Sequence, residues 1–223
     1  MNAMMLALAL ALQTQPPPQP APPLRSEGPP SREITPAHDI FEDEFRVPTP
    51  AARIELHGFA ACVVERSPEL ATETLQRDFT SIRYRNALRQ LARNNESCFP
   101  RRGALRASGL PFAGSLAEHL LEQDQTPLNV RLAHAAGQPA LRPFSATDRI
   151  SLCVVRSVPD DVARLLAAEI GSEEENQAVE ALGLAVRVCS QGGPRLVTPA
   201  AGLRAIVATA AFRTIHSANE AGN

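Results

Sequence analysis

Apolar residues recur at intervals of three and four along residues 51–66, which is the spacing of one face of an α-helix. Ser67 and Pro68 follow, and a serine before a proline at the first helical position is a typical helix start. Ser81 marks another start, with apolar residues at helical spacing behind it. The first half of the chain is therefore predicted to hold four helices, near residues 51–66, 67–78, 81–95 and 110–123.

The second half of the chain repeats this plan. Ser145 and Ser172 each precede an apolar-periodic segment and have an acid three residues later, Asp148 and Glu175, as in a capping box. Residues 124–144 contain three prolines and are predicted to be a linker between the halves. Four further helices are expected near residues 146–157, 159–169, 173–188 and 201–215.

The two halves align with each other at an offset of 91 residues. Between residues 62–98 and 153–189 there are no gaps, and nine of the 37 positions are identical. Beyond the aligned segment, a two-residue shift brings Gly109 onto Gly202. We interpret the pattern as an internal duplication. The predicted fold is all-α, with two homologous four-helix units packed about a pseudo-twofold axis.

All four cysteines belong to this repeat, two in each copy and 36 residues apart. Before the duplication, the single repeat had to be complete on its own. This favours disulfides within each copy, Cys62 with Cys98 and Cys153 with Cys189. Four cysteines also allow two other connectivities, and four buried free thiols in a cytosolic protein are a further alternative. A zinc site fits less well because the sequence has no C-x2-C ligand pair.

The N-terminus is predicted to direct export. Residues 3–12 are all apolar, which is too short for a membrane span but suits a signal peptide, assigned here to residues 1–12. Residues 13–50 are proline-rich and are expected to be a disordered linker. They include an acidic, partly apolar stretch at residues 38–45 whose role the sequence leaves open. The remaining predicted segments are helical repeat 1 (51–123), the inter-repeat linker (124–144), helical repeat 2 (145–216) and a disordered tail (217–223).

The charged residues are unevenly placed between the copies. Arg85, Arg89 and Arg93 form an i, i+4, i+8 stripe on the third predicted helix, whereas Arg89 aligns with Glu180 in the acidic second copy. The stripe is a candidate contact for an anionic surface or a protein partner. Two other interpretations stay open, namely solvated faces that diverged and charges that are complementary between halves or protomers. Nucleic acid is not expected as a partner, because the formal net charge is −2 and aromatic residues make up 4% of the chain.

No catalytic motif is present in the sequence. All 22 basic residues are arginine, and the absence of lysine excludes Schiff-base chemistry. The sequence also lacks a G-x-S-x-G nucleophile elbow. The five histidines lack HxH or HExxH spacing. His119, beside Glu118 and Glu122, is interpreted as part of a surface pair rather than as a base, and His57 as an interfacial residue. No cofactor or metal is predicted, and the chain is not expected to be an enzyme.

The pattern Cys-Val-Val-x3-Pro-Glu/Asp begins at Cys62 and again at Cys153, and each copy continues with helical Leu/Ala spacing to a second cysteine. This pattern resembles a group of uncharacterised exported bacterial proteins with tandem, helical, cysteine-paired domains. The resemblance implies export and the fold, and it assigns no functional residue. The leading hypothesis is a periplasmic or secreted, non-enzymatic helical binding or scaffolding protein without a membrane span in its mature form. The alternatives are a small-molecule or lipid-binding helical protein and, more remotely, an enzyme of unrecognised type.

Overall fold

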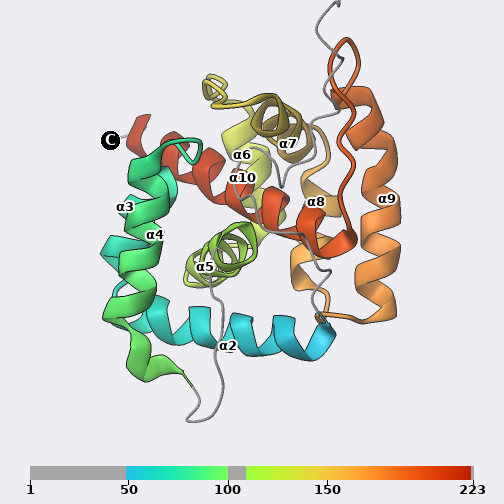
Figure 1. Cartoon of the computed structure of the whole chain (residues 1–223). Helices are drawn as coiled ribbons and strands as arrows, with labels where there is room; N and C mark the ends of the chain where they lie inside the picture. Colours follow the sequence, from blue (N-terminus) through green and yellow to red (C-terminus); the bar gives the residue numbers. More distant parts are fainter. Residues whose placement is uncertain (1–48, 100–108, 222–223) are drawn as a thin grey trace, which may run out of the picture. The chain divides into compact units, whose positions relative to one another are not determined.

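Helices α5 and α10 pack against each other in the middle of the fold, and the other helices lie around them (Figure 1). This computed structural model describes residues 49–99 and 109–221, which all fall within one compact unit assigned to residues 33–223. In this part of the chain the secondary structure is helical throughout, which confirms the predicted all-α class. The helices are α2 (Pro50–Arg66), α3 (Pro68–Gln76), α4 (Ile82–Asn94), the 3-10 helix η1 (Glu96–Cys98), α5 (Leu110–Glu122), α6 (Leu128–Ala136), α7 (Ala146–Ser157), α8 (Pro159–Ala167), α9 (Glu173–Cys189) and α10 (Ala200–Ala221).

Three sequence predictions lie outside the described residues. They are the signal peptide at residues 1–12, the proline-rich linker up to residue 48 with its acidic stretch, and the last two residues of the predicted tail, 222–223. Among the helices of residues 49–99 and 109–221, none combines the length and the hydropathy that crossing a membrane requires.

Local signals in the sequence account for where the helices begin. Proline occupies the first position of α2, α3 and α8, where its missing N–H breaks no helical hydrogen bond. The hydroxyls of Ser81, Ser145 and Ser172 each accept a hydrogen bond from the backbone N–H three residues later, as predicted. Ser67 precedes α3 without such a side-chain bond, so the proline after it is the main start signal there.

The structure differs from the sequence prediction in two places. Residues 124–144 were expected to be a linker, but they contain α6, whose Leu132 and Ala135 are buried against α7, α8 and α10. The prolines of this stretch flank the helix instead of interrupting it, since Pro127 is its N-cap and Pro139 follows its end. In addition, α10 continues to Ala221, although residues 217–223 were expected to be a disordered tail.

Two disulfides fasten the helices, and they are the pairs predicted within each copy. Cys62 of α2 is bonded to Cys98 of η1, and Cys153 of α7 is bonded to Cys189 at the end of α9. The Cα atoms of each pair are 5.8 Å apart. The first bond therefore ties α2 to η1, which follows α4, and the second ties α7 to the end of α9.

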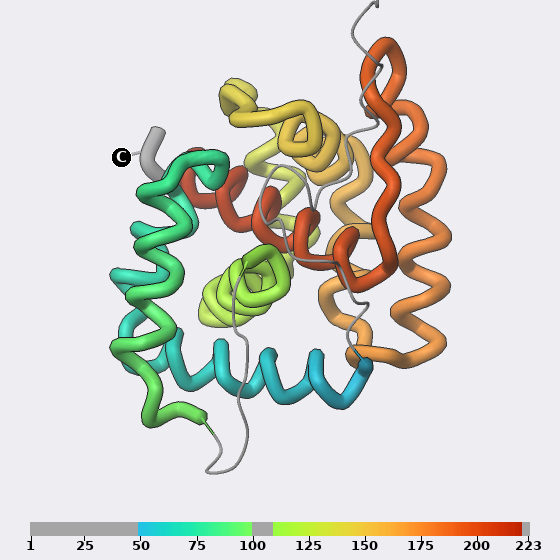
Figure 2. Tube along the Cα trace, viewed as in Figure 1, coloured from blue at the N-terminus to red at the C-terminus, as the bar shows by residue number. Residues whose placement is uncertain are grey.

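The contact between α5 and α10 carries no covalent bond and depends on close packing (Figure 2). A Cβ atom added to Gly114 of α5 would lie 2.6 Å from both Cα and Cβ of Ala205 in α10. Glycine at this position therefore allows the two helices to approach at a distance that any side chain would prevent.

Candidate functional site

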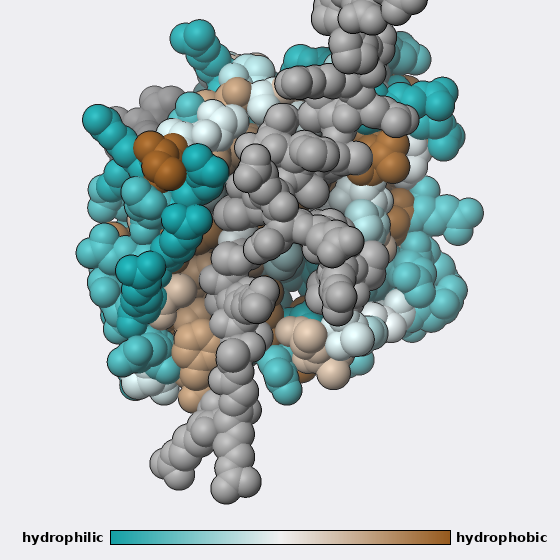
Figure 3. Space-filling model, viewed as in Figure 1, coloured by the Kyte–Doolittle hydropathy of each residue, from teal (hydrophilic) through white to brown (hydrophobic). Residues whose placement is uncertain are grey.

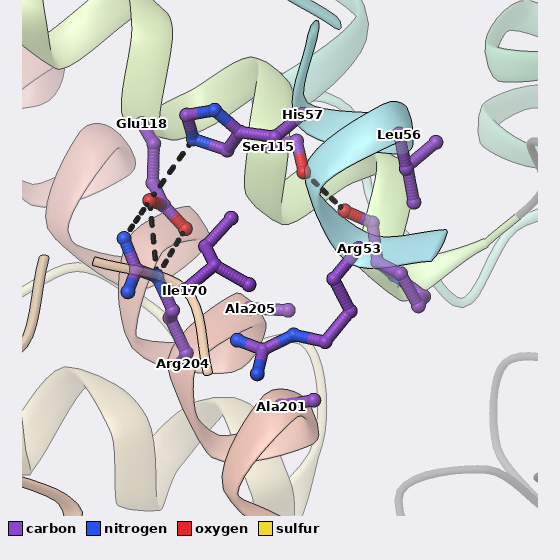
Figure 4. Close-up of a pocket in the computed structure, with 10 residues that line it drawn as sticks. Arg53, Leu56, His57, Ser115, Glu118, Ile170, Ala201, Arg204 and Ala205 are labelled. Carbon is purple, nitrogen blue, oxygen red and sulfur yellow. Dashed lines mark hydrogen bonds and ion pairs between the residues drawn. The ribbon is translucent and has the colours of Figure 1, made fainter. Parts of the chain in front are cut away.

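A small hollow opens between α2, α5 and α10, and charged side chains line it (Figure 4). Arg53 and His57 come from α2, Glu118 from α5 and Arg204 from α10, while Ile170 lies in the turn before α9. The hollow has a volume of about 30 Å³. That volume is enough for about one water molecule.

Arg204 occupies the centre of this charged group and is buried. Its Nε donates to both carboxylate oxygens of Glu118, at 3.0 and 3.1 Å, and its Nη2 donates to Oε2 of the same residue at 2.7 Å. Nη1 donates to Oε1 of Glu175 at 3.2 Å and to the carbonyl of Ala168 at 2.8 Å. Nη2 also reaches the carbonyl of Leu166 at 3.1 Å, so all three guanidinium nitrogens of Arg204 have acceptors.

Glu175 connects this arginine to the start of α9 and to α2. Its carboxylate forms a two-pronged pair with Arg53, with Oε2 accepting from Nη1 at 2.8 Å and Oε1 from Nη2. Oε2 also accepts the backbone N–H of Gly171 at 2.8 Å, while the Glu175 N–H donates to the Ser172 hydroxyl. Gly171 has φ +82°, and a Cβ there would lie 2.7 Å from Cβ of Pro50, so the turn requires glycine. The Glu175 side chain thus serves both in the cap at the start of α9 and in the ion pair with Arg53.

Two histidines lie at the edge of the network, with ring centroids 4.0 Å apart. Nε2 of His57 is 3.3 Å from Oε2 of Glu118. His119 has an acceptor at each ring nitrogen: Nδ1 is 2.9 Å from Oε2 of Glu122, and Nε2 is 2.9 Å from the His57 carbonyl. Two acceptors favour the doubly protonated ring, and although burial alone would lower the pKa of His119, the Glu122 hydrogen bond and charge raise it.

The carboxylates of the network are held in their ionised form. Burial by itself would raise the pKa of Glu118, but hydrogen bonds from His57 and Arg204 outweigh it, so the pKa is lowered. Burial likewise opposes ionisation of Glu175, and the hydrogen bonds from Arg53 and a backbone N–H lower its pKa below the usual range. Carboxylates paired in this way are weak bases, and the network is better suited to joining α2 and α5 to α9 and α10 than to transferring protons.

A second hollow of about 30 Å³ lies between α4, α7 and α10. Nη1 of Arg213 is 2.6 Å from Oδ1 of Asp148, and its guanidinium stacks 4.1 Å from the centre of the Phe144 ring. The other oxygen of Asp148 accepts the Phe144 N–H at 2.7 Å. Tyr84 completes this site, and burial raises the pKa of its hydroxyl, with Arg213 partly opposing the effect. One charged pair, Arg213 with Asp148, thus lines this hollow beside apolar side chains such as Phe79.

The predicted arginine stripe lies on α4, and its three arginines line neither hollow. Arg89 and Arg93 are exposed, and Arg85 is half-buried. Arg89 donates from Nη1 to Oδ1 of Asn86 at 3.4 Å. No residue of α4 lines the first hollow, and no arginine of α4 forms an ion pair with another described residue. The charges of Arg89 and Arg93 are therefore presented to solvent, whereas Nε of Arg85 is buried.

Sequence reasoning identified only the edge of the buried network. The pairing of His119 with Glu122 at the surface is confirmed, but Glu118 turns inward to Arg204. Glu175 was recognised only as a capping residue, and Arg204 was not singled out at all. One signal was present: Arg204 interrupts the apolar run of α10, and an arginine on a buried face requires an anionic partner. The sequence alone does not say which acid provides it.

Within residues 49–99 and 109–221, no group of three or more His, Cys, Asp or Glu side chains is arranged to hold a metal ion. The sequence matches no protein-family model, no curated protein and no solved structure.

Proposed function

We propose that this chain is an exported, non-enzymatic binding or scaffolding protein whose contact surface is the arginine face of α4. The observation that carries the proposal is the exposure of Arg83, Arg89 and Arg93 on a helix that contains no acidic residue. Long arginine side chains without ion-pair partners in the fold are available to an anionic surface or an acidic protein.

Export is supported by the two disulfides, because such bonds persist in oxidising compartments and are rare in the cytosol. The apolar residues 3–12 have the length and composition of the hydrophobic part of a signal peptide. The resemblance to exported bacterial proteins with tandem cysteine-paired domains fits the same compartment. We therefore place the mature protein in the periplasm or outside the cell.

The two halves are further proposed to be copies of one four-helix unit. A constant offset of 91 residues supports this: α3 and α8 begin 91 residues apart, and so do α4 and α9. Each disulfide spans the same 36 residues. Gly114 and Ala205, which touch where α5 meets α10, are also 91 residues apart, as expected for equivalent residues near a twofold axis.

The two hollows support the same relationship. Six positions that line one hollow have an equivalent, 91 residues away, that lines the other. The offset stays at 91 through α5 and α10, so the two-residue shift of the sequence alignment is not needed there. The pairs are Leu56/Thr147, His57/Asp148, Ser115/Ile206, Glu118/Thr209, Ile170/Phe79 and Ala201/Leu110. Equivalent positions line the two hollows, but the residue types at these positions differ. This difference favours a duplicated scaffold over a duplicated active site.

A non-enzymatic role is supported by the state of the buried acids. Glu118 and Glu175 are paired with Arg204 and have a lowered pKa, whereas a general base needs a pKa near the working pH. The alternative role in binding small molecules or lipids gains little from the hollows, each of about 30 Å³. Pockets for drug-sized ligands occupy roughly 300–1,000 Å³.

Export is tested by a non-reducing peptide map of the protein recovered from its native host. We expect a mature N-terminus near residue 12 and the linked pairs Cys62–Cys98 and Cys153–Cys189. An intact N-terminus together with four free thiols would contradict export and place the protein in a reducing compartment.

The contact surface is tested by placing a photo-crosslinking residue at Gln90, which is exposed on α4. A matched control carries it at Gln123, exposed at the end of α5. Adducts that form in the native host from position 90 and not from position 123 support the proposal. Equal labelling at the two positions, or none at position 90, contradicts it.

A further inference from the structure

The outer faces of α4 and α9 carry opposite charges at equivalent positions. The basic face of α4 consists of the exposed residues Ile82, Arg83, Arg89 and Arg93. The acidic face of α9 consists of the exposed residues Glu173, Glu174, Glu180, Leu184 and Val188, and the exposed Arg187 lies near its C-terminal end. At the offset of 91, Arg83 corresponds to Glu174 and Arg89 to Glu180. Each face thus has a net charge of one sign together with exposed aliphatic side chains.

The two faces do not meet within one chain. Helices α4 and α9 lie on opposite sides of the view, with α5 and α10 between them (Figures 1 and 2). Figure 3 shows a largely hydrophilic surface on both of these sides, with small separate hydrophobic patches. On the acidic face, Glu173 accepts only a 3.5 Å hydrogen bond from Gln177, and the glutamates form no ion pair with another described residue. The basic and acidic faces therefore do not pair with each other within one molecule.

We propose that the basic face of α4 binds the acidic face of α9 on a second copy of this chain, so that copies associate head to tail. The inference rests on the proposed function, which makes α4 the contact surface, and it names the partner. The two faces of a pair differ, so the interface is heterologous and each copy keeps one face of each kind free. Association therefore extends beyond two copies.

Antiparallel alignment of the two helices satisfies both the charges and the aliphatic residues. When Arg93 lies beside Glu173, Ile82 falls beside Leu184, and Arg89 comes within one turn of Glu180. A parallel alignment that pairs Arg89 with Glu180 would set Ile82 beside Glu173. The antiparallel arrangement also brings opposite ends of the helix dipoles together.

The proposal predicts a weak association that salt suppresses. Sedimentation velocity of the full, oxidised chain would cover about 10 µM to about 1 mM protein at about 0.05 M and about 0.5 M NaCl. At low salt we expect the average mass to rise with concentration above the 23.9 kDa of the monomer. At high salt the rise should largely disappear, because exposed charges are screened.

Charge reversal gives the decisive comparison. Arg89→Glu/Arg93→Glu makes both faces acidic, and Glu173→Arg/Glu180→Arg makes both basic, so each variant alone should associate at least about tenfold more weakly. An equimolar mixture of the two variants should associate again, since each then meets an opposite face. The control Arg142→Glu/Arg195→Glu changes the net charge by the same amount at exposed arginines outside both faces, and it should associate like the original chain.

The outcomes separate this inference from the proposed function. A chain that stays monomeric at low salt, or variants that fail to recover on mixing, would overturn head-to-tail association. Suppose that the original chain stays monomeric but binds phosphatidylglycerol vesicles, and that Arg89→Glu/Arg93→Glu does not bind them. The contact surface on α4 is then supported, with lipid headgroups as its partner. If vesicle binding and adducts from position 90 are both missing as well, the proposed function fails too.

Discussion

Arg204 and Glu118 face each other across the contact of α10 and α5, 86 positions apart in the sequence, with Nη2 and Oε2 separated by 2.7 Å. Both side chains are buried, at 4% and 5% exposure. A buried pair of this kind stabilises a fold little relative to apolar packing, but either partner left alone is costly. The pair therefore acts chiefly to fix how the two halves dock.

Replacing Arg204 with methionine should strongly destabilise the fold, because the change leaves Glu118 and Glu175 without their shared partner. We expect a loss of about 3–5 kcal/mol in the free energy of unfolding, measured by urea titration. Arg164→Met, which breaks the exposed pair with Asp161, serves as control and should change the value by less than about 1 kcal/mol. Equal losses in the two variants would contradict the buried role.

Acid should unfold the protein partly through the same network. Because the folded-state pKa of Glu118 lies below its ordinary value of 4.5, the stability that ionised Glu118 provides is present above that pH. It is lost as the pH falls through the lower, folded-state value. Urea titrations from neutral pH downward should show a shallower acid loss for Glu118→Gln than for the original chain. If stability falls with pH equally in the variant and the original chain, ionisation of Glu118 does not contribute to the acid loss.

His119 should give the opposite pH dependence. Its raised pKa means that the stability contributed by the protonated ring is fully present below the ordinary value of 6.5. It disappears as the pH rises through the folded-state value. An NMR titration of the ring should show a raised midpoint that drops in Glu122→Gln, since Glu122 is the main partner raising it. An unchanged midpoint in that variant would assign the shift to another group.

Each disulfide should contribute a similar amount of stability, because each closes a loop across the same 36 residues. Cys62→Ala/Cys98→Ala and Cys153→Ala/Cys189→Ala should each lose about 3–4 kcal/mol on the chain-entropy model. The loops do not overlap, so the two losses should add in the variant lacking all four cysteines. Thermal unfolding under non-reducing conditions measures this, and a reduced chain of full stability would refute it.

Two glycine substitutions should act in opposite directions. Gly114→Ala brings a Cβ to 2.6 Å from the backbone of Ala205 and should destabilise the fold by about 1–3 kcal/mol through overpacking. Gly58→Ala meets nothing within 4 Å on the exposed face of α2, so it should stabilise the protein by about 0.5–1 kcal/mol. Denaturant titration of both variants checks the pair. A neutral Gly114→Ala would mean that α5 and α10 can separate without penalty.

The features that the sequence predicted well are those encoded locally. Pro68, Pro159, Ser81 and Ser172 act within one turn of the helix that they start, so their effect is visible in a short window. The cysteine pairing followed from comparing the halves, and it is confirmed. Helix α6 was missed because prolines on both sides of a short helix resemble the composition of a linker.

The buried network could not be predicted in the same way. Glu118 and Arg204 meet only after α5 and α10 have packed, and nothing near either residue encodes the other. Glu175 has a complete local explanation as a helix cap, which conceals its second role in binding Arg53 and Arg204. Tertiary pairing of charges is set by the crossing of helices, which sequence periodicity does not specify.

The disulfides leave the two halves joined only by one exposed backbone connection and by non-covalent contacts. Residues 122–127 are exposed, and α6 packs with α7, α8 and α10 on the far side of that connection. Each side of a cut there would keep its own complete cross-link. The chain is therefore suited to division into two separately produced fragments that reassemble through α5 and α10, and tethering each fragment to a different protein would turn reassembly into a reporter of proximity.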